Sequence, residues 1–121
     1  MLAANQAFYD AFEACDLDAM SDLWLHDDRS VCTHPGWATL RGWAAIGASW
    51  FAIFQNPERL QLILTNVNAN VSGDLAWVSL DENLLAARAS GTVAALNVFE
   101  RIEGRWRLVA HHGSSVLASQ S

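Results

Sequence analysis

The sequence predicts an α+β fold, a cone-shaped roll in which three N-terminal helices pack on a strongly curved mixed or antiparallel sheet. Three observations lead to this expectation. Apolar residues recur at helical spacing in the first half of the chain, and the period changes from 3.6 to 2 after Pro57. Short turn sequences then separate long β patterns, as in hairpin-connected strands. Helices and strands segregated along the chain in this way pack as two layers.

The first two helical patterns lie next to each other. Residues 2–15 place their apolar side chains on one helical face, and these are Ala4, Phe8, Ala11, Phe12 and Cys15. Asp16 is expected to cap a second helix through its carboxylate. That helix carries the apolar stripe Leu17, Met20, Leu23 and Trp24 and ends before residues 26–28.

A short strand and a third helix follow. Residues 29–34 alternate in the manner of a strand, and Pro35 stops it because proline has no N–H to donate to a sheet. A helix of about 13 residues is expected from Trp43, since bulky apolar groups recur there at helical spacing. Asn56 and Pro57 end it.

Four long strands complete the predicted fold. They are expected at residues 60–71, 75–87, 92–102 and 105–117. The turns between them are residues 72–74, 89–91 and 103–104. The last of these turns has two residues, a length that suits a hairpin.

Length and composition limit the classes of protein. A chain of 121 residues suits one domain, residues 1–121, and 52% hydrophobic residues can form a core without a metal or disulfide. The net charge of −6, with seven unclustered Lys and Arg, argues against nucleic acid and anionic membranes as partners. Without a signal peptide or a long apolar run, the chain is expected to be cytoplasmic. Cys15 and Cys32 lack metal-binding spacing and are expected to be buried free thiols.

Five stretches carry a resemblance to a known superfamily. They are residues 15–20 before Trp24, residues 27–31, His34-Pro35-Gly36-Trp37, residues 40–46, and residues 99–108. Together they resemble the nuclear transport factor 2-like superfamily, to which SnoaL-like polyketide cyclases, ketosteroid isomerases, scytalone dehydratase and limonene-epoxide hydrolase belong. The resemblance implies a ligand-binding cone, no cofactor, and a homodimer formed through the face of the sheet.

The comparison with ketosteroid isomerase concerns three positions. Its general base, an Asp before a Pro, corresponds to His34 here. Its oxyanion-binding Tyr and Asp fall on Phe8 and Val98, which have no donor group. Tyr9 is about 100° further around the helix and is not expected to replace the Tyr. Steroid isomerase activity is therefore not expected.

The predicted catalytic residues are His34, His111 and Asp81. A histidine can transfer protons at neutral pH, so His34 is the expected base, and His111 is the expected acid or hydrogen-bond donor. Neighbouring strand residues point to opposite faces, so only one of His111 and His112 enters the cone. The resemblance to the isomerase-like members implies that His111 faces inward and His112 outward. Asp81 is the carboxylate that could orient a histidine. The alternative for His34 is a buried histidine that hydrogen-bonds a backbone carbonyl and only caps the strand end. The alternative for His111 is an ordinary residue of the sheet.

The expected ligand-binding residues are Trp37, Trp50, Trp77, Ser79 and Cys32. For strand 75–87 two orientations remain open. Either Trp77, Ser79 and Asp81 point into the cone, or Val78 and Leu80 fill it and the first set faces outward.

These residues predict a protein that binds a small apolar or aromatic molecule. The function considered first is a cofactor-independent isomerase, cyclase or dehydratase that uses a His base on an apolar carbonyl compound. The alternatives are a ligand binder without catalysis and a dimeric protein-interaction module. The four histidines lack a paired spacing for a metal, so no metal site is expected.

Overall fold

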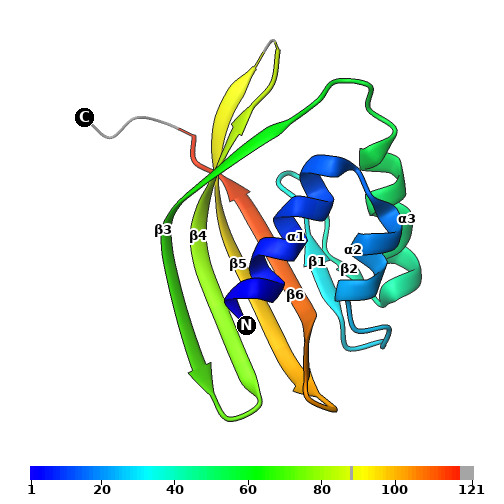
Figure 1. Ribbon diagram of the computed structural model, residues 1–121. Coiled ribbons are helices and arrows are strands. Elements are labelled where there is room, and N and C mark those ends of the chain that lie inside the picture. The colour runs from blue at the N-terminus through cyan, green and yellow to red at the C-terminus, as the bar shows by residue number, and fades with distance from the viewer. Residues whose placement is uncertain (88, 118–121) are drawn as a thin grey trace.

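The computed structural model describes residues 1–87 and 89–117; the predicted domain, residues 1–121, also includes positions outside this described part. The elements are α1 (Leu2–Ala14), α2 (Leu17–Leu23), β1 (Val31–Thr33), β2 (Leu40–Arg41), α3 (Trp43–Phe54), β3 (Gln61–Ser72), β4 (Leu75–Leu85), β5 (Ser90–Ile102) and β6 (Arg105–Ser115). The predicted α+β fold, with three helices on a mixed sheet, is confirmed (Figure 1).

The corner between α1 and α2 follows from local chemistry. Asp16 accepts a hydrogen bond from the Ala19 N–H at 3.0 Å, which is the N-cap expected from the sequence. The preceding Cys15 adopts a left-handed conformation with φ 53°, and its N–H bonds back to α1 carbonyls. Cys15 is partly exposed, so the expectation that both cysteines are buried is wrong for this one.

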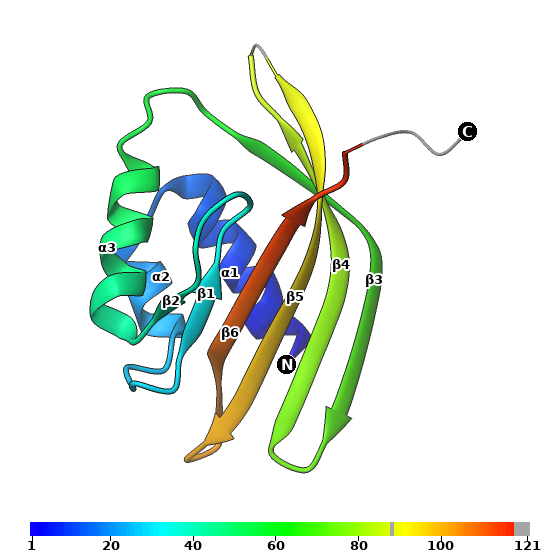
Figure 2. The same cartoon turned by 180° about the vertical axis from the view of Figure 1, so that it is seen from behind.

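The strands form one sheet in the order β2-β1-β6-β5-β4-β3. The four long strands are antiparallel neighbours, whereas β1 runs parallel to β6. The short β2, which the sequence pattern did not predict, pairs with β1 (Figure 2). Irregularities in pairing at Thr65/Asn68 and Val98/Phe99 interrupt the register, and bulges of this kind bend a sheet.

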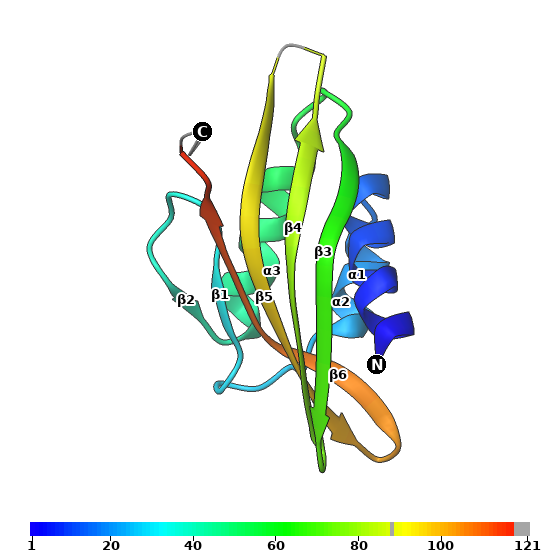
Figure 3. The ribbon, with the colours of Figure 1, turned by 90° about the vertical axis from the view of Figure 1, so that its left-hand side faces the viewer.

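The helices cover one face of the sheet, and within residues 1–87 and 89–117 no helix lies over the other face (Figure 3). The largest fully buried side chains, led by Trp24, Trp50, Phe8 and Phe99, lie in the core between the helices and the sheet. No helix among the described residues is long and apolar enough to cross a membrane. Polar side chains buried between the helices and the sheet are the candidates for a functional site.

Candidate functional site

His34 follows β1 directly and points into the core. It is only 4% exposed, and Ser49 of α3 lies 2.8 Å from its Nε2. The Ser49 hydroxyl donates to the Ile46 carbonyl oxygen, so it accepts from His34. His34 therefore carries its proton on Nε2 and has a lone pair on Nδ1, 3.9 Å from Sγ of Cys32. Burial lowers its pKa to about 4, which keeps the ring neutral at pH 7.

His111 lies on β6, paired in register with Cys32 of β1. Its Nδ1 is 2.5 Å from Oδ1 of Asn97, a fully buried residue of β5. The Asn97 amide donates to the Asn5 side-chain oxygen and to the Tyr9 hydroxyl, both at 3.0 Å. The Asn97 oxygen is thus the acceptor, and His111 donates from Nδ1. Burial, with repulsion from His34 and His112, lowers the His111 pKa to about 3.

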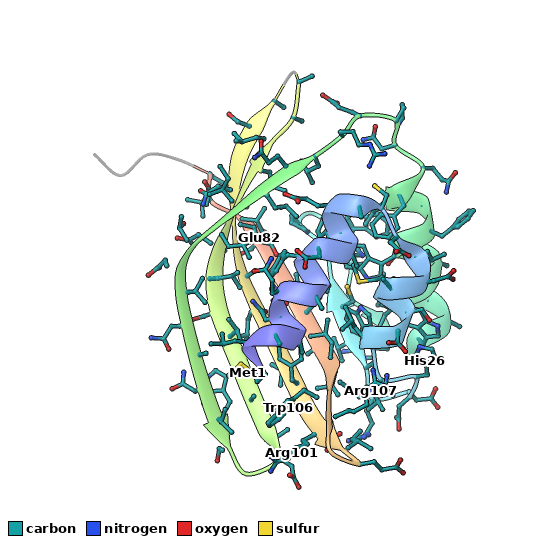
Figure 4. All side chains as sticks on the ribbon, in the orientation of Figure 1. Met1, His26, Glu82, Arg101, Trp106 and Arg107 are labelled. Atoms are coloured by element: carbon teal, nitrogen blue, oxygen red, sulfur yellow. The ribbon has the colours of Figure 1, made fainter. Side chains whose placement is uncertain are left out.

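The hydrogen bonds continue from Asn97 to an acid. The Tyr9 hydroxyl, which accepts from Asn97, donates to Oε2 of Glu82 at 2.5 Å. Glu82 lies on β4 beside α1 (Figure 4). The four side chains His111, Asn97, Tyr9 and Glu82 form one chain, called the interior chain below. Every donor in the interior chain points toward Glu82, which is its terminal acceptor.

Glu82 is the carboxyl group in the core. Its side chain is almost fully buried, and burial raises its pKa to about 7, although the Tyr9 hydrogen bond opposes this shift. Burial and the adjacent Glu82 charge raise the Tyr9 pKa above its usual range, so the phenol stays protonated. The interior chain therefore ends in a group that exchanges a proton near neutral pH.

Aromatic rings surround the two histidines. The ring centroids of His34 and His111 are 6.4 Å apart. Trp50 packs edge-on against His34 with centroids 4.7 Å apart, and Phe8 lies 5.0 Å from His111. The indole N–H of Trp50 is buried and has no hydrogen-bond partner among the described residues. Trp37 contacts His34 from the loop after β1, with centroids 4.9 Å apart, and stays 44% exposed.

Cys32 is buried as expected, beside His34. Its Sγ is 3.6 Å from Nε2 of that histidine. Burial raises the pKa of the thiol to about 12, so it remains protonated. A protonated thiol is a weak nucleophile, so Cys32 does not supply an activated nucleophile near neutral pH.

Trp77, Ser79 and Asp81 do not lie in the cone. On β4 the buried residues are Ala76, Val78, Leu80 and Glu82, so the alternate side chains face outward. Ser79 and Asp81 instead line a shallow hollow of about 330 Å³ on the outer face, together with His112. The expectation that Asp81 orients a cavity histidine is therefore wrong. Of the two orientations left open for strand 75–87, the structure has the one in which Val78 and Leu80 point into the core.

Three members of the interior chain were missed by sequence reasoning. Tyr9 and Phe8 are both buried, because α1 packs against α2 on one side and the sheet on the other. Tyr9 therefore lies in the core beside Phe8, although it is offset from Phe8 around the helix. Val98 pairs with the outward Trp77, and Asn97 points inward in its place. Alternation along β4 gave no signal for Glu82, because both faces of the strand carry large apolar residues, Trp77 on one and Val78 on the other.

The surface grooves described by the structure have neither His34 nor His111 in their linings. One of about 700 Å³ is at the end of α2 and carries the Asp22–Arg105 ion pair. Another, of about 350 Å³, runs between α1 and β3, and Tyr9 is one of its lining residues. Its other lining residues are Gln6, Asp10, Glu13, Leu62, Ile63 and Leu64. The α1–β3 groove thus reaches a member of the interior chain.

The fold and site define a nuclear transport factor 2-like protein. Residues 1–119 match the SnoaL-like domain, and the chain belongs to that family. A solved structure from Streptomyces avermitilis, proposed to be a dehydratase of the NTF2-like family, is similar with a TM-score of 0.89 and 38% identity. The match covers 96% of this chain and 93% of that one.

Other relatives have different descriptions. A Thiobacillus denitrificans structure, proposed to be a calcium/calmodulin-dependent protein kinase type II association domain, is 37% identical with a TM-score of 0.83, covering 95% of this chain and 94% of that one. F-box protein SKIP8 of Arabidopsis thaliana is 29% identical over 117 residues, 97% of this chain. The chain spans about half the length of this curated relative, 50%.

Proposed function

We propose that this protein binds a small, apolar carbonyl compound in its cone and acts on it as a cofactor-independent isomerase, cyclase or dehydratase. The observation that carries the proposal is the set of oriented polar groups inside an otherwise apolar core. His34 and His111 are each held neutral in one tautomer, with a lone pair on Nδ1 and Nε2 respectively. Such a lone pair can accept a proton from a carbon acid or hold a ligand hydroxyl.

The energetics of burial support a functional origin for these groups. Burying a polar side chain costs the free energy of its hydration, and an apolar side chain of similar size would not carry this cost. A fold that needed only stability could fill these positions with leucine or phenylalanine. Perturbed titratable groups gathered in one interior are more typical of active sites than of structural cores.

Proton abstraction can be tested without knowing the natural substrate. The protein is incubated in deuterium oxide with α-tetralone, an apolar cyclic ketone, and proton NMR follows loss of the hydrogens next to the carbonyl. We expect H34Q and H111Q to slow this exchange by about 100-fold or more, the usual contribution of a general base. H112Q is the matched control, because His112 is the exposed neighbour of His111.

The outcomes separate the first two functions. Exchange that depends on His34 or His111, and not on His112, supports proton-transfer catalysis. Binding of α-tetralone, seen as shifted protein resonances, with exchange no faster than in buffer supports a ligand binder without catalysis. Wild-type exchange that survives both H34Q and H111Q would overturn the assignment of these histidines.

A second candidate function is assembly into a homodimer or a larger complex through the outer face of the sheet. Leu75, Trp77 and Leu96 are exposed on that face, each by more than a third. The Thiobacillus relative described as an association domain also favours this candidate. Sedimentation velocity should give a dimer for the wild type at micromolar concentration and a monomer for Trp77→Glu. A monomeric wild type would contradict it.

A further inference from the structure

We propose that Glu82 is a further group, besides the two histidines, that exchanges a proton with the bound molecule, and that a neutral apolar compound with a carbonyl or hydroxyl group reaches it through the α1–β3 groove. The proposal deepens the proposed function, on which it rests for the class of molecule. It assigns a catalytic residue that lies on the opposite side of the strand from Asp81.

Glu82 is placed immediately behind the groove. Leu64, which lines the groove on β3, is the direct partner of Glu82 in the β3–β4 pair. Tyr9 lines the same groove from α1 and donates its hydroxyl hydrogen to Oε2 of Glu82. A molecule that displaces the Leu64 side chain from the groove therefore meets the carboxyl group first, with the Tyr9 hydrogen bond in place.

The contacts fix which oxygen of Glu82 can act. Oε2 accepts the hydroxyl hydrogen of Tyr9, so the proton of the neutral acid is carried by Oε1. In the neutral acid, Oε1–H donates to the oxygen of the ligand and can transfer its proton there. The carboxylate left behind keeps the Tyr9 hydrogen bond and takes a proton back from the ligand or from water. The step is balanced and needs no further reactant.

The surroundings favour a neutral, apolar molecule. Leu62 and Leu64 form the β3 wall of the groove, whereas Asp10 and Glu13 line it from α1 and repel anions. Apart from Tyr9, the groups that face Glu82 from the neighbouring strands are uncharged, Leu64 on β3 and Val93 on β5. His111, at the far end of the interior chain, is neutral at pH 7 because burial lowers its pKa. Burial raises the pKa of Glu82 to about 7, so both of its protonation states occur near neutral pH.

The test uses dicyclohexylcarbodiimide, an apolar reagent that requires a protonated carboxyl group. The carboxyl oxygen bonds to the central carbon and the acid proton moves to a nitrogen. The adduct rearranges to a stable N-acylurea that retains the mass of the whole reagent. The intact, folded protein is labelled at pH 7 and then digested. Mass spectrometry of the peptides should place this adduct on Glu82. Labelling should fall about 50-fold between pH 7 and pH 9, as the neutral form disappears.

Three variants locate the site and its entrance. E82Q should remove the adduct, whereas D81N, one residue away on the outer face, should keep it. Gln6→Trp fills the groove from the exposed side of α1 and should reduce labelling at least fivefold without moving its pH midpoint. Ala45→Trp, an exposed position on α3 outside the groove, is the control and should label as the wild type. Y9F removes a hydrogen bond that lowers the Glu82 pKa, so its labelling should persist to higher pH.

Two results would overturn the proposal. One is absence of an adduct on Glu82 at pH 7 in protein that labels elsewhere. The other is labelling of Glu82 that Gln6→Trp leaves unchanged, which would mean a different entrance. Because labelling is measured without a substrate, either failure is independent of the deuterium-exchange test of the histidines.

Discussion

Replacing Glu82 with glutamine is expected to change how the stability of the protein depends on pH. In the wild type, the folded-state pKa of Glu82 is about 7, against an ordinary value of 4.5. The folded protein therefore holds a proton that the unfolded chain releases between these two values. The stability of the Glu82 site is complete below pH 4.5 and is lost as the pH rises through 7.

The magnitude follows from the size of the shift. A difference of about 2.5 pKa units corresponds to about 3 kcal/mol of unfolding free energy lost by pH 8. About 2 kcal/mol of this is already lost at pH 6, and almost none at pH 4. Glutamine does not titrate, so this pH-dependent loss is absent in E82Q. Any constant effect of the amide group cancels when two pH values are compared within one variant.

The assay is urea unfolding of wild type, E82Q and the control D81N at half-unit steps from pH 4 to pH 8.5. The unfolding free energy of E82Q minus that of the wild type should rise by about 3 kcal/mol between pH 4 and pH 8. D81N is the control, because it replaces a carboxylate on the outer face of the same strand. A difference between E82Q and wild type that stays level within about 0.5 kcal/mol would refute a buried, proton-binding Glu82.

Three further predictions concern other parts of the fold. His34 has a folded pKa of about 4, below its ordinary 6.5, so its contribution to stability is complete above pH 6.5 and lost as the pH falls toward 4. In urea unfolding, the unfolding free energy of H34Q minus that of the wild type should therefore rise by about 3 kcal/mol from pH 7 to pH 4. H112Q is the control. Asn97→Ala removes the partner of the His111 and Tyr9 side chains and should lower the unfolding free energy by about 3 kcal/mol or more at pH 7; a loss below about 1 kcal/mol would contradict the interior chain. Asp16→Ala should cost about 1 kcal/mol through loss of the N-cap, and recovery of most of that in Asp16→Ser would identify capping as the cause.

The elements were predictable because they depend on local pattern. Apolar spacing located the three helices, and the change of period at Pro57 located the start of the long strands. The Asp16 cap follows from the preferences of one residue type. The short strand β2 has only two residues and forms because it pairs with β1, so no periodic signal announces it.

The site was only partly predictable. His34 and His111 were found because histidine is rare and chemically distinctive, and both do lie in the core. Which face of β4 points inward depends on tertiary packing, so Asp81 and Glu82 could not be separated by alternation alone. Asn97 was missed because the position that matches the Asp of ketosteroid isomerase is its neighbour Val98, whose side chain lies on the other face of β5. Tyr9 was missed because a helix packed on two sides buries more than its apolar stripe.

The state of the Glu82 carboxyl group can be measured directly by carbon-13 NMR. Protein labelled at the glutamate carboxyl carbon is titrated from pH 4 to pH 9, and the E82Q spectrum identifies the Glu82 resonance. A midpoint near pH 7 is expected, moving to higher pH in Y9F as the Tyr9 hydrogen bond is lost. A midpoint near 4.5 that does not respond to Y9F would mean that Glu82 is hydrated, and that the interior chain does not end in a group able to exchange protons near neutral pH.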